Sequence, residues 1–210
     1  MELFIDSSRE TLSLSLVDKN KIVFKSNVDS HSKHSNYLIN ELKKNLELYN
    51  VNLSDIDNFI TLNGPGSFTG VRVGVTVSKV LAWILGKNLY LLNNLESLKV
   101  GTSDEVVITV IPDKKNYSYV GIYDDNTLES YLSISDEKLV FNNKKITIIT
   151  LSNNDFTNSL YNNLCINNEV KLKVIEDYNY VDLISYALTK EKVDPHLAKP
   201  IYLKKIDVEK

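Results

Sequence analysis

The stretch Asn63-Gly64-Pro65-Gly66-Ser67-Phe68-Thr69-Gly70-Val71-Arg72-Val73-Gly74 decides the fold of this chain. It begins at the end of a short apolar run, residues 59–63, which has the length of a buried strand. Glycine and proline are dense over residues 64–70, and such density marks a tight connection, because glycine tolerates backbone conformations closed to other residues. The pattern predicts a strand, a glycine-rich loop and a second regular element.

The segment after this loop fits two patterns. Valines at 71, 73, 75 and 77 alternate with other residues, as in a half-buried strand. Small residues at 70, 74, 78 and 82 recur every four positions, and on a helix they would form one ridge. The run to Leu85 exceeds an average strand of about five or six residues, and Gly86 suits a helix C-cap. We therefore predict a helix over residues 67–85.

The chain before the loop predicts a sheet followed by a helix. Residues 2–6, 11–17 and 21–28 are apolar or alternating and are separated by turn residues, which indicates three antiparallel strands. From residue 32 to residue 50, leucines at 38, 42 and 46 lie at helical spacing, which indicates an amphipathic helix. Residues 88–92 predict another short strand.

The second half of the chain is rich in predicted strands. Residues 101–104 read as a break between domains. We expect strands near 106–111, 117–123, 127–134, 145–151 and 170–175, a helix over 180–189, and polar loops at the asparagine-rich stretches near Asn142, Asn153, Asn162 and Asn167. The predicted domains are residues 1–100, completed by the tail 195–210, and a smaller domain over residues 101–194.

Composition excludes several classes of protein. Hydrophobic residues make up 43% of the 210 residues, enough for a core, so disorder is excluded. The net charge is −3 without blocks of like charge, so we expect any contact with nucleic acid to be indirect. The single cysteine, Cys165, excludes an internal disulfide and fits a reducing cytoplasm. We find no signal peptide or membrane span in the sequence and expect a cytoplasmic protein.

The chemical motifs leave alternatives open. The glycine loop could cradle phosphate, with Asp6, Ser67, Thr69 and Arg72 as candidate contacts, but it lacks the Gly-Lys-Ser/Thr of a P-loop and serves equally as a structural turn. His31 and His34 could share a metal or simply mark the start of a helix. The sequence contains no Gly-x-Ser-x-Gly elbow or other nucleophile motif, so it predicts no catalytic centre of its own.

Residues 63–74 resemble the signature Gly-Pro-Gly-Ser-Phe-Thr-Gly-Leu-Arg-Ile-Gly of the TsaB (YeaZ) family, bacterial proteins of N6-threonylcarbamoyladenosine tRNA modification. The resemblance is strong over residues 1–100 and sparse beyond. Residues 111–117 read Ile-Pro-Asp-Lys-Lys-Asn-Tyr where the family usually reads Ile-Asp-Ala-Arg-Arg-Gly-Glu. Supporting matches are Phe-Ile-Asp-Ser-Ser at 4–8, His-Ser at 34–35, Leu-Glu-Ser-Leu at 95–98 and Pro-Ile-Tyr-Leu-Lys-Lys at 200–205.

The resemblance implies an α/β protein with the actin-like ATPase (ASKHA) fold, two related ribonuclease-H-like domains with mixed sheets, the second reduced. It implies a non-catalytic scaffold that dimerises with TsaD, the enzyme that transfers the threonylcarbamoyl group to N6 of the adenosine beside the anticodon of ANN-decoding tRNAs. TsaE commonly completes the bacterial complex, and tRNA contact is indirect. No cofactor of its own is expected; ATP or ADP and metal are expected on TsaD or at the complex interface. The chain lacks the His-x-x-x-His pair that TsaD uses for its metal.

In the family, the contact with TsaD is a bundle of two helices from each partner, here residues near 35–49 and 67–85. The small-residue ridge would allow close backbone approach, so Gly74→Leu would block the complex and leave the subunit folded. Without a partner, the same surface could pair with a second copy. The alternative for the ridge is packing within its own domain. The expected interface residues are Leu38, Leu42, Leu46, Gly70, Val71, Gly74, Ser78 and Ala82.

Two other functions compete with the scaffold. A stand-alone kinase or ATPase of the actin-like superfamily would use Asp6 and the glycine loop to bind ATP. A peptidase, suggested by an old association of these families with glycoproteases, ranks last because the sequence offers neither a metal set nor a nucleophile.

Overall fold

The computed structural model describes residues 1–29, 34–114, 116–133 and 139–204, so His31 lies outside the described residues. The chain divides into two compact units. The first contains Met1–Asn94 and Asn179–Ile201, and the second contains Leu95–Tyr178 and Tyr202–Lys210. The expected boundary near residue 100 is therefore slightly late, and the segment that completes the first unit begins at Asn179 instead of residue 195.

The first unit is built on a mixed five-stranded sheet with the order β3-β2-β1-β4-β5. Strand β1 pairs antiparallel with β2 and parallel with β4. Strands β2 and β3 are antiparallel, and β4 and β5 are parallel, so the predicted three-stranded opening is confirmed. The strands are β1 (Glu2–Asp6), β2 (Thr11–Asp18), β3 (Lys21–Asp29), β4 (Asn58–Leu62) and β5 (Asn88–Leu92).

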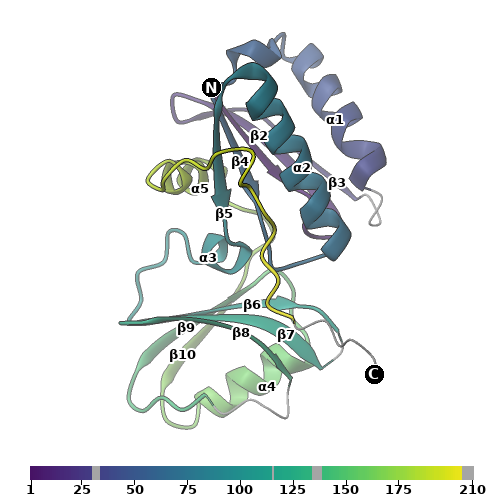
Figure 1. Ribbon diagram of the computed structural model, residues 1–210. Helices are drawn as coiled ribbons and strands as arrows, with labels where there is room; N and C mark the ends of the chain where they lie inside the picture. The colour runs from purple at the N-terminus through teal and green to yellow at the C-terminus, as the bar shows by residue number, and fades with distance from the viewer. Residues whose placement is uncertain (30–33, 115, 134–138, 205–210) are drawn as a thin grey trace, which may run out of the picture. The chain divides into compact units, whose positions relative to one another are not determined.

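Helices cover both faces of this sheet (Figure 1). The helices α1 (His34–Leu48) and α2 (Phe68–Leu85) lie on one face, and α5 (Tyr180–Ala187) lies on the other. A short 3₁₀ turn, Leu53–Asp55, precedes β4. Because side chains alternate along a strand, Leu3 and Ile5 join the core under α1 and α2, whereas Phe4 packs against Tyr180 of α5 with ring centroids 5.6 Å apart.

Both ends of α2 are fixed by residues visible in the sequence. The Ser67 side chain accepts a hydrogen bond from the backbone N–H of Gly70 at 3.2 Å, which caps the N-terminus. Gly86 ends the helix in the left-handed conformation, with φ at 63°. The helical prediction for this segment is confirmed, and the alternating valines do not form a strand.

The small-residue ridge of α2 faces the sheet of its own unit. Gly70, Gly74, Ser78 and Ala82 are all buried, and α2 packs against β4 and β1. A Cβ atom added at Gly74 would lie 2.7 Å from Ser7 Oγ. The ridge therefore allows helix α2 to approach its own sheet closely, and the expectation that it meets a partner is wrong.

Helix α2 also has the length and composition of a membrane span. Over its 18 residues the mean hydropathy is 1.4, and 33% of that window is buried. A helix that packs in the core of a soluble domain passes the same test, and the inner side of α2 is occupied by the sheet. Composition alone is thus weak support for a membrane role.

The second unit repeats the sheet topology of the first. Its order is β10-β9-β6-β7-β8, in which β6, β7 and β8 are antiparallel neighbours and β9 adds parallel to β6. Strand β10 then adds parallel to β9, as β5 adds to β4. The strands are β6 (Val106–Pro112), β7 (Tyr117–Tyr123), β8 (Thr127–Ser133), β9 (Lys145–Thr150) and β10 (Glu169–Val174). The expectation of two related domains with mixed sheets is confirmed.

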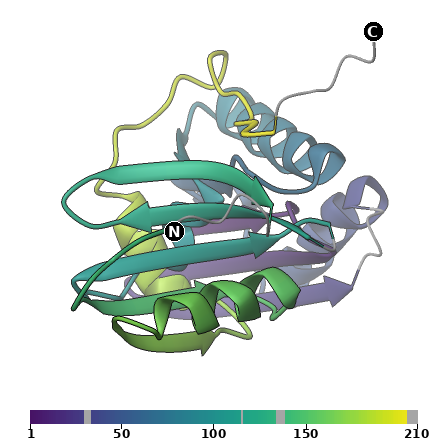
Figure 2. The same cartoon turned by 90° about the horizontal axis from the view of Figure 1, so that it is seen from below.

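Helix α4 (Asp155–Leu164) lies across one face of this second sheet (Figure 2). The expectation of polar loops holds near Asn142, Asn153 and Asn167 but is wrong near Asn162, which lies in this helix. Phe156, Leu160 and Leu164 recur every four residues and are buried in the core of the unit, while Asn154 caps the N-terminus by accepting from the Thr157 N–H at 2.9 Å. The short helix α3 (Asn94–Leu98) begins at the boundary between the units.

We predict that Gly74→Ala destabilises the first unit. Ser7 Oγ donates to the Gly70 carbonyl at 2.8 Å, so it cannot turn away from a new methyl group without losing that bond. We expect overpacking to lower the free energy of unfolding by about 1–3 kcal/mol. Alanine also favours the helix over glycine by up to about 1 kcal/mol, and this gain offsets part of the loss. Chemical denaturation measures the change, and Thr76→Ala on the exposed side of α2 is the control, with a change within about 0.5 kcal/mol.

A double-mutant cycle tests whether contact with Ser7 Oγ causes the loss of stability in Gly74→Ala. Ser7→Ala removes the hydroxyl that the new methyl group would meet, so the double variant should lose less stability than the sum of the two single changes. Strict additivity of the two changes would contradict the proposed close contact.

Candidate functional site

The glycine-rich loop is fastened to the end of β1. The Ser67 N–H donates to the Ser8 carbonyl at 2.8 Å, and Ser7 Oγ donates to the Gly70 carbonyl. A Cβ at Gly66 would lie 2.7 Å from the Ser8 carbonyl oxygen. The loop needs glycine at this position because its backbone lies directly against the backbone after β1.

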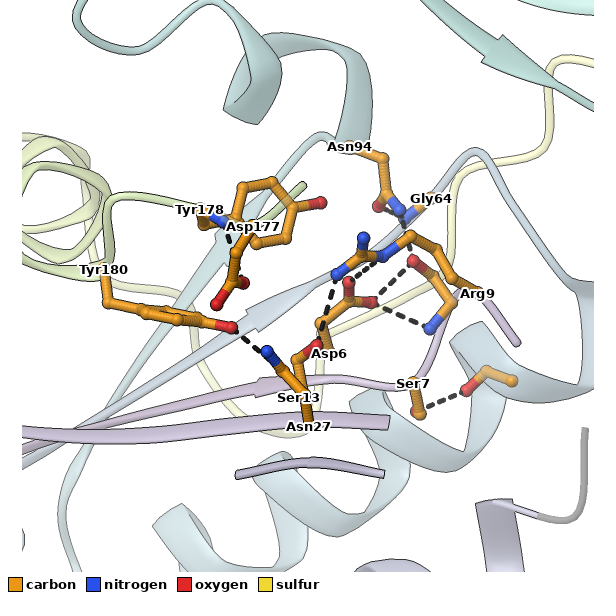
Figure 3. Close-up of polar contacts among 12 residues, drawn as sticks. Asp6, Ser7, Arg9, Ser13, Asn27, Gly64, Asn94, Asp177, Tyr178 and Tyr180 are labelled. Carbon is orange, nitrogen blue, oxygen red and sulfur yellow. Dashed lines mark hydrogen bonds and ion pairs between the residues drawn. The ribbon is translucent and has the colours of Figure 1, made fainter. Parts of the chain in front are cut away.

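Asp6 ends β1 and is fully buried (Figure 3). Its Oδ1 accepts from the Ser8 N–H at 2.8 Å and from Ser8 Oγ at 2.6 Å. Its Oδ2 forms an ion pair with Arg9 Nε at 2.9 Å, and the Arg9 guanidinium also donates to Ser13 Oγ at 3.2 Å. Both carboxylate oxygens are therefore engaged by the chain itself.

Asn94 extends this network to the glycine loop. Its Nδ2 donates to Ser8 Oγ, and its Oδ1 accepts from the Gly64 N–H at 2.8 Å. Neither Arg9 nor Asn94 is among the site residues predicted from the sequence, and Ser8 appears there only in the segment matched at residues 4–8. The rarity of arginine in the sequence could have singled out Arg9, because the chain has only two arginines. Nothing in the sequence singles out Asn94, because it is one of many asparagines and lies 86 positions from Ser8.

The candidate phosphate contacts are used in different ways. Asp6 is buried and binds Ser8 and Arg9, whereas the Ser67 side chain caps α2. Arg72 lies over the Phe68 ring, 3.8 Å from its centroid, on the exposed side of the helix, and Thr69 is exposed nearby. The structure thus does not gather these side chains around one point, and phosphate contact stays a prediction. Among the described residues, no group of three or more His, Cys, Asp or Glu side chains could hold a metal.

The expected interface residues belong to the core of the first unit. The placement on a contact surface is wrong for the small residues of α2, which pack against the sheet of their own unit. The three leucines of α1 are also buried in that core, but they line hollows beside α1. The residues concerned are Leu38, Leu42 and Leu46 of α1, and Gly70, Val71, Gly74, Ser78 and Ala82 of α2, all of which are buried.

The opposite side of α2 carries large exposed side chains. Trp83 is 59% exposed and Ile84 is 68% exposed, and Phe68 and Val80 are also open to solvent. At 3.6 residues per turn these positions lie opposite the buried ridge. We call this set the outer face of α2: Phe68, Thr69, Arg72, Thr76, Val80, Trp83 and Ile84.

An apolar groove runs between α1 and α2. Ile39, which is 51% exposed, lines both of its hollows, of about 390 Å³ and 510 Å³. The first hollow also borders Phe68 and Arg72, and the second borders Leu81. The groove and the outer face of α2 therefore form one continuous surface of the first unit.

Glu41 fixes α1 beside this groove. It accepts hydrogen bonds from Ser26 Oγ of β3 at 2.8 Å and from Asn45 Nδ2 at 3.0 Å. Burial by itself raises the pKa of Glu41, but these hydrogen bonds and the nearby Lys44 ammonium outweigh it and hold the pKa below its usual value. The ionised side chain thus ties the helix to the edge strand of the sheet.

The sequence is similar to two groups of known proteins. Residues 28–112 match the family model of TsaD, tRNA N6-adenosine threonylcarbamoyltransferase. The chain is 28% identical over 123 residues to the tRNA threonylcarbamoyladenosine biosynthesis protein TsaB of Bacillus subtilis, and 35% identical over 89 residues to TsaB of Buchnera aphidicola. These alignments cover 58% and 41% of this chain, and 54% and 38% of the relatives. The chain thus spans about half or less of the curated TsaB proteins it matches.

The fold is similar to a solved structure over nearly its whole length. YeaZ from Pseudomonas aeruginosa superposes with a TM-score of 0.69 at 20% identity, covering 96% of this chain and 99% of the other. The match to the TsaD family model, over residues 28–112, includes the glycine loop and its flanking elements. The chain is thus similar in sequence to TsaB proteins and in fold to YeaZ.

Proposed function

We propose that this chain acts in tRNA threonylcarbamoyladenosine biosynthesis as a non-catalytic subunit that dimerises with TsaD. The observation that carries the proposal is the continuous apolar surface made by the α1–α2 groove and the outer face of α2. Patches of this kind in soluble proteins mark sites of protein association. The matches to TsaB proteins and to the TsaD family support the choice of this pathway and of this partner.

The composition of this surface suits a stable complex. Tryptophan and arginine are the residues most enriched among those that dominate binding energy, and Trp83 and Arg72 lie on the same helix face. Burying one large apolar side chain contributes about 1.5–3 kcal/mol. Several such residues, among them Phe68, Trp83 and Ile39, suffice to exceed association costs of several kcal/mol.

The arrangement around Asp6 supports a scaffold better than a stand-alone kinase. A kinase of this superfamily would need the carboxylate to act on metal-bound phosphate, but here Ser8 and Arg9 take both of its oxygens. Drawing the Asp6 carboxylate toward a phosphate-bound metal would break its ion pair with Arg9. The network instead holds the loop that begins α2, the helix that carries the proposed interface.

The proposal also covers the cofactors, the further subunit and the cellular location of the complex. We place ATP or ADP and metal on TsaD or at its interface with this chain, which needs no cofactor of its own. We place TsaE in the same complex and the protein in the cytoplasm, and the surface can pair with a second copy when TsaD is absent. TsaD, and not this chain, carries out the transfer to the adenosine.

We predict that changes on the outer face of α2 weaken binding to TsaD. Trp83→Ala should raise Kd by roughly 30-fold or more, because a central tryptophan typically contributes at least about 2 kcal/mol. Val80→Asp should weaken binding further by placing a charge in the apolar patch. Calorimetric titration of purified TsaD gives the affinities, and thermal melts confirm that each variant is folded.

The matched control is Ile166→Ala in the second unit, because Ile166 is a large apolar residue with 75% exposure. We expect this variant to bind TsaD like the wild type. Wild-type affinity in both Trp83→Ala and Val80→Asp would overturn the interface.

We also predict that Asp6 is needed for stability and not for ATP turnover by the isolated chain. Asp6→Asn should lower the free energy of unfolding by about 3 kcal/mol, because it breaks a buried ion pair. Phosphate release from Mg-ATP should be at background for both wild type and Asp6→Asn. Turnover by the wild type that disappears in the folded variant would favour the kinase.

A further inference from the structure

Three tyrosines gather on one face of the second sheet. Tyr119 of β7 pairs directly with Tyr131 of β8, and Tyr117 lies two residues before Tyr119, on the same face. The rings of Tyr117 and Tyr131 stack, with centroids 5.4 Å apart and an interplanar angle of 13°. Tyr119 packs against Tyr131 at 4.8 Å. The rings of Tyr117 and Tyr131 therefore form a small stack, and the Tyr119 ring packs against Tyr131.

Polar contacts hold the middle ring of this group in place. Tyr131 donates its hydroxyl hydrogen to Asp113 Oδ2 at 2.6 Å, and Lys204 Nζ lies 3.4 Å from the same oxygen. Lys204 also lies over the Tyr131 ring, 5.2 Å from its centroid. Burial and the Asp113 charge raise the pKa of Tyr119 to about 12, so this ring stays neutral at physiological pH. Tyr131 is therefore held by a carboxylate and a cation, Asp113 and Lys204, which are themselves paired.

Tyr117 is the open member of the group. Its side chain is 41% exposed, whereas Tyr119 is buried. Lys114 lies in the turn before β7, where its carbonyl accepts a hydrogen bond from the Tyr117 N–H at 3.0 Å. An exposed aromatic ring backed by a second ring thus follows the exposed Lys114 in the chain, and the partly exposed Lys204 lies over that second ring.

We propose that Tyr117, Lys114 and Lys204 form a contact site for an unpaired segment of RNA. A base would stack on Tyr117, and the flanking phosphates would meet the two ammonium groups. Aromatic side chains bind splayed-out bases without sequence preference, and nearby cations neutralise the backbone. The choice of RNA over DNA rests on the proposed function. The stacked arrangement of the rings is an observation that does not depend on that function.

This proposal refines the expectation that RNA contact is only indirect. A net charge of −3 still excludes tight binding by the whole surface. Two cations predict a weak contact whose salt dependence is shallow, with a slope of about −1.4 in log K against log salt for a single strand. Such a site would position RNA that another subunit holds.

Fluorescence anisotropy with a labelled 12-nucleotide single-stranded RNA tests the proposal on the full-length chain. We expect Tyr117→Ala to raise Kd roughly tenfold and Tyr117→Phe to leave it within about twofold, because stacking needs the ring and not the hydroxyl. Lys114→Gln should reduce the magnitude of the salt slope by about 0.7, the share of one phosphate contact. The matched control is Tyr186→Ala in α5, where Lys190 also lies over a tyrosine ring, at 4.6 Å.

The outcomes separate this site from the proposed function. Equal Kd values for wild type and Tyr117→Ala, an equal loss in Tyr186→Ala, or a preference for DNA of the same sequence would each overturn the RNA site. Tyr117→Ala should still bind TsaD with wild-type affinity, because its change lies outside the α1–α2 surface. A loss of TsaD binding in Tyr117→Ala would contradict the separation of the two sites.

Discussion

The close approach of α2 to β1 and β4 is the constraint on which the first unit depends. Gly74 leaves no space for a side chain, and the neighbouring small residues continue the contact along the helix. Because this side is committed to the sheet, the large residues of α2 must lie on the opposite side. The exposed Phe68, Trp83 and Ile84 are therefore a direct consequence of how the helix packs. The surface available to a partner is the outer face of α2, and the small-residue ridge is its support.

The buried carboxylate of Asp6 gives the loop before α2 a fixed position. Asp6 holds Ser8, Ser8 receives Asn94, and Asn94 holds the backbone of Gly64. Arg9 balances the buried charge and itself remains partly accessible. A buried ion pair seldom adds much net stability over an apolar core, but loss of one member is costly. The network therefore fixes the loop in one arrangement, in keeping with the proposed interface on the helix that follows it.

The two units show how one topology can serve different purposes. Both have three antiparallel strands followed by two parallel ones. In the first unit, α1 and α2 cover one face of the sheet and α5 covers the other, and the exposed apolar surface lies on α1 and α2. In the second unit, α4 covers one face, and a row of tyrosines occupies strands β7 and β8 on the other. The signature loop lies only in the first unit, which agrees with the position of the TsaD family match.

The sequence by itself determined the resemblance to the TsaB family, the three antiparallel strands that open the fold and the helical nature of residues 68–85, because these depend on local spacing, capping residues and one specific loop. It also contained the signal for α4, three apolar residues at helical spacing after a capping asparagine, although the surrounding asparagines obscured it. Only the tertiary structure decided which side of α2 faces the sheet, because a ridge of small residues suits a helix partner and a sheet equally well. The same holds for Asn94 and Ser8, since residues 86 positions apart meet only when the strands are assembled. Periodicity fixes the faces of an element, whereas the choice of what each face contacts depends on packing across the whole chain.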